Sequence, residues 1–285
     1  ITIEKTLRGK SEFTNDVRAL RNLKYNKLNT LLGIMALVIC AIPVIIGFII
    51  PFVTLINWAI GNINNINIYN FFNLVFSSFM LALVASIICI IFAIIIIYGV
   101  RTNKKIASPF ARLASLGYSI PGAVAAVGVL IPLAWLDNLI NSISLSYFEI
   151  SFGLILTGSW FALLFAYLVR FLALSMNSVE SSFIKIPKSL DYVAKVLGSS
   201  NSKILTKVNA RIGFGGISLG LLIVFVDVLK ELPATMILRP FGLNTLAIKA
   251  HEYAIDERLG DASIPLLAII VVCLIPLYIL SRRIR

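Results

Sequence analysis

The sequence predicts an all-α membrane protein with about six transmembrane helices, and three observations support this fold class. Hydrophobic residues make up 59% of the 285 residues and charged residues only 13%, whereas charged residues make up about 25% of a soluble domain. The mean hydropathy is +0.96. No charged residue occurs between Lys27 and Arg101. A soluble helical protein would need long helices without a polar face, and such helices are buried or lie in lipid.

The individual spans follow from the apolar stretches. The hydrocarbon core of a bilayer is about 30 Å thick and a helix rises about 1.5 Å per residue, so a span needs about 20 residues. Pro43 and Pro51, with Gly47 between them, predict a kinked and tightly packed first span. By this measure the six predicted spans lie near residues 30–59, 70–99, 112–136, 151–172, 213–230 and 261–280.

The distribution of charge predicts the topology. Residues 1–29 are polar and basic, and we expect them to be a cytoplasmic lead-in or linker to a six-span domain over residues 30–285. The chain opens on Ile1 and a charged stretch without a signal-peptide pattern, so we expect it to continue a longer polypeptide. Of the 25 Lys and Arg residues, 21 fall on the side that holds both ends of the chain. The positive-inside rule predicts that this side is cytoplasmic.

The remaining polar signals predict neither catalysis nor a metal site. The net charge of +12 follows from the topology, so lipid is an expected partner and nucleic acid is not. The three cysteines lie in apolar spans without a CxxC spacing, which is typical of small buried hydrophobes. Residues 9–11 (GKS) imitate the end of a P-loop, but Glu4 stands where the first glycine is needed. His251 lacks a second zinc-binding histidine and is expected in a solvated loop.

The segment 173–211 is predicted to be a cytoplasmic loop with two short amphipathic helices. Pro187 suits a first helical turn and Gly198 a helix end. Ile204 and Val208 then form a second, shorter apolar stripe. From the residues alone, the first stripe either docks onto another protein or lies on lipid headgroups, which the flanking lysines would favour. Its members recur at i, i+3, i+4 and i+7, and they are Leu190, Val193, Ala194 and Leu197.

Three charged residues are expected near the outer end of the fifth span. Asp227, Lys230 and Glu231 stand at i, i+3 and i+4, which places them on one face of a helix. A charge at membrane depth costs at least about 2.5–3.5 kcal/mol, so it normally faces a cavity or a partner. Two interpretations stay open. One is a structural Asp227–Lys230 pair that anchors the helix end; the other is a translocation path along the three residues, with Asp227 or Glu231 touching the cargo.

Several tracts resemble the permease subunits of ATP-binding-cassette (ABC) importers, and most of all the iron(III) permease branch. The resemblance covers about residues 20–285 and is carried by residues 225–235 (FVDVLKELPAT), 238–247 (LRPFGLNTLA), 40–51 (CAIPVIIGFIIP) and 117–123 (GYSIPGA). The first amphipathic segment, residues 190–198 (LDYVAKVLG), stands where that superfamily carries its EAA loop. The family pattern is Glu-Ala-Ala, three residues, Gly, nine residues and an apolar residue, closed by Leu-Pro. Ala194 and Gly198 keep it, whereas Tyr192 replaces the acid and Arg211 the proline.

The resemblance implies a fold, partners and roles for individual residues. The fold would be that of type I ABC importer permeases, and the chain would be the second of two homologous six-span halves. Arg239 would contact an extracytoplasmic iron(III)-binding protein, although it could equally anchor to lipid headgroups. Coupling to an ATPase subunit would involve Leu190, Tyr192, Val193, Ala194, Leu197, Gly198 and Val208.

The same resemblance implies a transport subunit of the bacterial inner membrane and not an enzyme. ATP and Mg would be bound by a partner ATPase dimer, and this chain would bind no cofactor. The further implied partners are the iron(III)-binding protein and the homologous permease half. Two alternatives stay open. One keeps the fold and changes the cargo to a phosphonate, a polyamine or an inorganic oxyanion; the other is a secondary transporter or channel.

Overall fold

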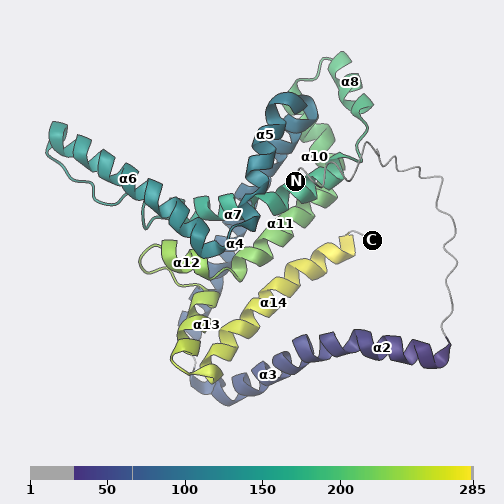
Figure 1. Ribbon diagram of the computed structural model, residues 1–285, viewed down its shortest axis with the longest axis vertical. Coiled ribbons are helices and arrows are strands. Elements are labelled where there is room, and N and C mark those ends of the chain that lie inside the picture. Colours follow the sequence, from purple (N-terminus) through teal and green to yellow (C-terminus); the bar gives the residue numbers. More distant parts are fainter. Residues whose placement is uncertain (1–28, 66, 284–285) are drawn as a thin grey trace. The chain divides into compact units, whose positions relative to one another are not determined.

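The structure is a computed structural model that describes residues 29–65 and 67–283 (Figure 1). The expected basic lead-in over residues 1–29 therefore lies, except for its last residue, outside the described residues. The chain forms two compact units, residues 1–52 and 53–285.

The first unit contains helix α2, Thr30–Val44, and a π-helical turn, Ile45–Ile49. The Asn29 side chain begins α2 by accepting a 2.8 Å hydrogen bond from the Thr30 N–H. Helix α3, Ile50–Asn62, starts in this unit and continues into the second. The π-helical turn lies between Pro43 and Pro51, whose missing N–H groups interrupt the regular hydrogen bonding of an α-helix. The turn lies where a kink was predicted, whereas no residue of α2 or α3 is buried among the described residues, so the predicted tight packing of this span is not observed.

The second unit is a bundle around α4, α7 and α11, which pack against one another (Figure 1). Helix α12 packs on α6, and α13 packs on α14. Short 3-10 turns, Ile63–Asn65 and Gly117–Ser119, connect some of the helices. The helices after α3 are α4 (Ile68–Thr102), α5 (Lys104–Ser115), α6 (Gly122–Phe148), α7 (Trp160–Phe183), α8 (Lys188–Val196), α9 (Asn201–Lys203), η5 (Ile204–Asn209), α10 (Ala210–Ile212), α11 (Phe214–Leu229), α12 (Pro233–Leu238), α13 (Leu246–Ile255) and α14 (Leu259–Arg283).

Small residues allow α11 to approach α7 closely. A Cβ atom on Gly216 would lie 2.5 Å from the carbonyl oxygen of Ser178 and would overlap the side chain of Ser182. Gly220, one turn later, faces Ser178 and Ile90 in the same way. Apolar association gives little drive between helices in lipid, so such close van der Waals contact is a main source of helix packing there.

We therefore expect Gly216→Val to destabilise the bundle, by about 1–3 kcal/mol if it behaves as overpacking does in other cores. The matched control is Gly215→Val on the same helix, because a Cβ atom at Gly215 meets nothing within 4 Å. Thermal unfolding of the detergent-solubilised protein measures the difference. Equal unfolding temperatures for the two variants would contradict the close-packing role of Gly216.

The third predicted span is displaced along the sequence. Residues 112–115 belong to the separate helix α5, and the long helix α6 begins only at Gly122. Pro121 lacks an N–H group and holds the preceding Ile120 in an extended conformation, so the helix cannot run through this point. Gly117 lies so close to the Val169 carbonyl that a Cβ atom would overlap it. A hydropathy window does not detect such a break.

The fourth predicted span is displaced in the same direction. Residues 151–159 lie outside any helix, and α7 begins at Trp160 after the N-cap Ser159. The preceding segment turns at Gly153 and Gly158, both with positive φ. It is held by Asp137, a fully buried carboxylate of α6 that accepts hydrogen bonds from the backbone N–H groups of residues 155–157 and from the Thr157 hydroxyl. These partners make a buried charge tolerable, which explains why α6 extends through Asp137.

Five helices in the described residues are long and apolar enough to cross a membrane, namely Thr30–Asn62, Ile68–Thr102, Gly122–Phe148, Trp160–Phe183 and Leu259–Tyr278. Residues Asn201–Ile212 and Phe214–Leu229 together would make a sixth, bent by 79°. The prediction of an all-helical membrane protein with about six spans is thus confirmed.

Candidate functional site

The first amphipathic helix of the loop forms as α8. Pro187 stands at its N-cap position, and Gly198, with φ of 80°, ends it in the left-handed conformation that favours glycine. The Ser199 N–H donates to the Ala194 carbonyl at 3.0 Å and the Gly198 N–H to the Lys195 carbonyl at 2.9 Å. This pair of bonds is the Schellman arrangement of a helix C-terminus. The predicted helix limits are therefore confirmed. The loop between α7 and α11 is shorter than the predicted 173–211, because residues 173–183 belong to α7.

The large apolar residues of α8 are exposed, whereas Ala194 is half-buried. Val196 is 88% exposed, and the large apolar residues of the predicted stripe are exposed with it. Val196 was not part of that stripe, and the structure adds it. We call this set the α8 surface, and it consists of Leu190, Tyr192, Val193, Val196 and Leu197. A contiguous exposed apolar patch on a short helix is typical of an interaction site.

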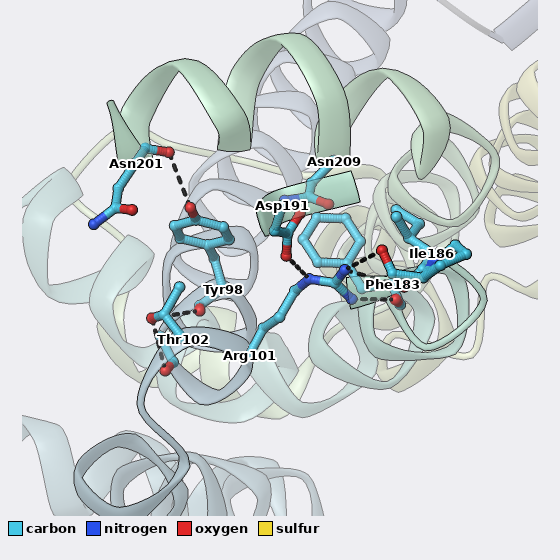
Figure 2. A network of polar contacts seen from close by, with 10 residues as sticks. Tyr98, Arg101, Thr102, Phe183, Ile186, Asp191, Asn201 and Asn209 are labelled. Atoms are coloured by element: carbon cyan, nitrogen blue, oxygen red, sulfur yellow. Dashed lines mark hydrogen bonds and ion pairs between the residues drawn. The ribbon is translucent and has the colours of Figure 1, made fainter. Parts of the chain in front are cut away.

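Arg101, at the end of α4, holds α8 in place through a set of hydrogen bonds (Figure 2). Its Nε donates to Asp191 Oδ2 of α8 at 2.6 Å, and the Arg101 side chain is only 8% exposed. Its Nη1 donates to the Phe183 carbonyl at 2.9 Å, and its Nη2 to the Ile186 and Pro187 carbonyls at 3.0 and 3.3 Å. One guanidinium thus joins three elements: α4, the end of α7 and α8. No local pattern in the sequence points to Arg101 or Asp191, because they are 90 residues apart.

The second short helix is anchored to the same place. Ile204 is fully buried, whereas Val208 is half-buried. Asn209 is also fully buried, and its Nδ2 donates to Asp191 Oδ1 at 3.2 Å. The Tyr98 hydroxyl of α4, one turn before Arg101, donates to the Asn201 carbonyl at 3.0 Å (Figure 2). The second helix therefore faces inward, and only the first offers an apolar surface outward.

The charges expected on one face of the fifth span are divided between two ion pairs. Helix α11 ends at Leu229, so Glu231 is not on the same helix as Asp227. Lys230 Nζ lies 2.6 Å from Asp227 Oδ1, and the Lys230 side chain is 64% exposed. Glu231 is 6% exposed and its Oε1 forms an ion pair with Nη1 of Arg170 on α7. The prediction that all three charges share one helix face was therefore wrong. The predicted Asp227–Lys230 ion pair is present.

Arg170, one of the 21 basic residues counted on the expected cytoplasmic side, lies in the middle of α7. Its pairing with Glu231 joins α7 to the junction between α11 and α12. The Ala234 N–H also donates to Glu231 Oε1, at 3.2 Å, and Gly122 lies so close to the pair that a Cβ atom there would overlap it. Nearby, the Tyr167 and Thr235 hydroxyls are 2.6 Å apart. These contacts hold α12 against α6 and α7.

A polar cavity of about 580 Å³ is lined by residues at the start of α4 and by residues of α13 and α14. Helix α13 lies at the end of the unit away from α8 (Figure 1). Lys249 and the Arg258 guanidinium lie over the Tyr253 ring, 4.7 and 5.0 Å from its centroid. Asn67, Asn70, Asn73, Asn244 and Asp261 contribute further polar groups. No pattern in the sequence predicts this cavity, because its lining comes from segments that are far apart in the chain.

Arg239, the predicted contact with a binding protein, lies in the turn between α12 and α13. Its Nη1 donates to Asn244 Oδ1 at 2.5 Å and its Nη2 lies 3.5 Å from Glu252 Oε1, so the side chain orders this turn. Phe241, two residues later, is fully exposed at the tip. In the described residues no group of three or more His, Cys, Asp or Glu side chains could hold a metal ion.

Comparison with known proteins connects this geometry to a class of fold. No family model matches the chain. Over 192 residues the chain is 24% identical to the Fe(3+)-transport system permease protein FbpB 2 of Haemophilus influenzae. This match covers 64% of the chain and 38% of that relative, so the chain spans well under half of the protein that it resembles.

Solved structures give the same class. A chain of a bacterial alginate ABC transporter, in complex with an alginate-bound periplasmic protein, aligns with a TM-score of 0.63 at 15% identity, covering 89% of this chain and 95% of that one. Another structure of an alginate importer gives 0.64 at 14% identity, with coverages of 88% and 96%. The MetNI methionine ABC transporter gives 0.52 at 14% identity, with coverages of 75% and 94%. The chain thus has the all-helical fold of ABC transporter permeases, and its sequence is distantly similar to that of an iron(III) permease.

Proposed function

We propose that this chain is the membrane-embedded permease part of an ATP-driven importer, and that the α8 surface docks onto an ATPase subunit in the cytoplasm. The observation that carries the proposal is the α8 surface itself. An amphipathic helix with its apolar side outward suits a hydrophobic groove on a partner. ATP and Mg would be bound by that partner. The chain would work by alternating access, with α8 transmitting the movement of the ATPase dimer to the spans.

The rigid attachment of α8 favours a protein partner over lipid headgroups. An interfacial helix lies in the plane of the membrane surface with its apolar side in lipid, and this binding requires no fixed attachment to the other helices. Here four hydrogen bonds from Arg101 fix α8 relative to α4 and α7. A surface that must fit a groove gains from such preorganisation, because less freedom is lost on binding.

Iron(III) is the proposed cargo, and this assignment rests on the distant similarity to an iron(III) permease. A hard cation prefers carboxylate oxygen ligands, yet a permease must hold its cargo weakly. Asp227 and Glu231 are each paired with a cation, which would weaken any contact that they make with the cargo in a translocation path. A phosphonate, a polyamine or an oxyanion is the alternative cargo.

The remaining partners follow from the same assignment. An extracytoplasmic iron(III)-binding protein would face Arg239, Phe241 and the polar cavity. A homologous six-span half, either fused or separate, would complete the permease in the bacterial inner membrane. The docking role of the other predicted residues, Ala194, Gly198 and Val208, would be to shape the loop that carries the α8 surface.

Site-directed crosslinking tests the docking. With the native cysteines replaced by alanine, Val196→Cys is expected to crosslink to an ATPase subunit in native membranes, because Val196 lies on the α8 surface. Phe241→Cys is the control, since this residue is equally accessible but lies in the turn between α12 and α13. Crosslinks from neither position, together with transport in vesicles that lack any ATPase, would support a secondary transporter or channel instead. Uptake of radioactive iron(III), with phosphonate, polyamine and oxyanion as competitors, tests the cargo.

A further inference from the structure

The guanidinium of Arg101 connects the α8 surface to a long helix that reaches the other end of the unit. Helix α4 has 35 residues, which corresponds to about 50 Å. Arg101 lies at its last turn, next to α8, whereas Asn70 and Asn73 in its first turns line the polar cavity. Helix α4 therefore contacts α8 at one end, through Arg101 and Asp191, and lines the cavity at the other.

We propose that Arg101 is the positioning residue through which movement of α8 is passed to α4, and so to the polar cavity. The inference rests on the proposed function of α8. Its physical basis is that Arg101 uses Nε, Nη1 and Nη2 at once. The planar guanidinium therefore fixes an orientation, which the single charged point of a lysine cannot do. Asp191 accepts from Arg101 on one oxygen and from Asn209 on the other, so both short helices of the loop are joined to α4.

Burial makes this connection stiff. The Arg101 side chain is nearly buried and that of Asp191 only slightly less so, so water competes weakly for their ion pair. Breaking such a pair by removing one partner leaves a charge without compensation. When α8 is displaced, moving α4 with it preserves these bonds, whereas separating the two helices breaks them.

The test uses the full transporter, with its ATPase subunits, reconstituted in liposomes. Nitroxide labels at Phe72→Cys on α4 and Leu259→Cys at the start of α14 report the distance across the cavity end by pulsed electron resonance; both side chains are exposed. With Arg101 intact, this distance is expected to change when ATP and Mg are added. Arg101→Lys keeps the charge and is expected to reduce that change by about threefold or more, in the range of coupling effects seen for single substitutions.

If Arg101 only stabilised the fold, its replacement would impair ATPase docking and helix movement together. Two further measurements on Arg101→Lys therefore distinguish the two effects. At saturating ATPase, where the preorganisation of α8 no longer limits docking, crosslinking from Val196→Cys to the ATPase and the basal ATP hydrolysis are expected to persist, while cargo moved per ATP falls. Arg112→Lys, on an exposed arginine of α5, is the matched control and should leave every readout unchanged. If Arg101→Lys folds poorly, Asp191→Asn breaks the same ion pair and is expected to give the same loss. The double variant should then be no worse than either single one.

The outcomes distinguish this inference from the proposed function. If the parent complex shows no ATP-dependent change between the labels, or if the variants show the full change, the inference is wrong although α8 still docks. If Val196→Cys does not crosslink to an ATPase even with Arg101 intact, the proposed function itself fails.

Discussion

Glu231→Ala is expected to destabilise the protein severely, by about 3–5 kcal/mol, because it leaves the charge of Arg170 without its partner inside the bundle. The same change removes the acceptor for the Ala234 N–H. Glu252→Ala is the matched control. Glu252 also belongs to ion pairs, with Arg239 and Lys249, but all three side chains are about one third exposed. Its loss should cost at most about 1 kcal/mol.

Thermal unfolding of the detergent-solubilised variants measures both costs. A second variant separates charge from shape. The double change Arg170→Met and Glu231→Met removes both charges at similar volume and is expected to recover much of the stability, as replacement of buried ion pairs does elsewhere. Similar unfolding temperatures for Glu231→Ala and Glu252→Ala would show that the Arg170–Glu231 pair does not hold α7 to the α11–α12 junction.

The second large effect is expected at the α8 surface. Val196→Asp combined with Leu197→Asp should weaken ATPase binding by about a hundredfold or more, because docking would then bury carboxylates without partners, at a cost of several kcal/mol. Both side chains project from the protein, so its own thermal stability should stay within about 0.5 kcal/mol of the parent.

Co-purification of the ATPase with the permease, at a series of concentrations, measures this loss. Phe241→Asp is the control, because it places the same charge on an equally exposed apolar residue away from α8. It should leave ATPase binding intact, and under the proposed function it should weaken the contact with the extracytoplasmic binding protein. Undiminished ATPase binding by the α8 double variant would mean that the ATPase docks elsewhere.

Local signals in the sequence predicted helix α8 correctly. Pro187 and Gly198 set its limits by their own backbone preferences, and the apolar spacing set its amphipathic character. The Asp227–Lys230 pair could also be predicted from the sequence spacing, because side chains three residues apart are neighbours on a helix. The third and fourth spans were displaced, because hydropathy reports the chemistry of a window and not where the backbone breaks. At Pro121 and at the turns held by Asp137, those breaks were decided by local geometry and by distant hydrogen bonds.

Composition and periodicity alone determined that this chain is a helical membrane protein with an amphipathic helix outside the spans, since both depend on burial of apolar side chains. Only the tertiary structure decided which charges meet. Arg101 and Asp191 are 90 residues apart, and Arg170 and Glu231 are 61 apart. In a nearly uncharged bundle, a buried charged side chain is stable only beside an oppositely charged or hydrogen-bonding group. The packing of α4, α7 and α11 determines which such group lies close enough to pair with it.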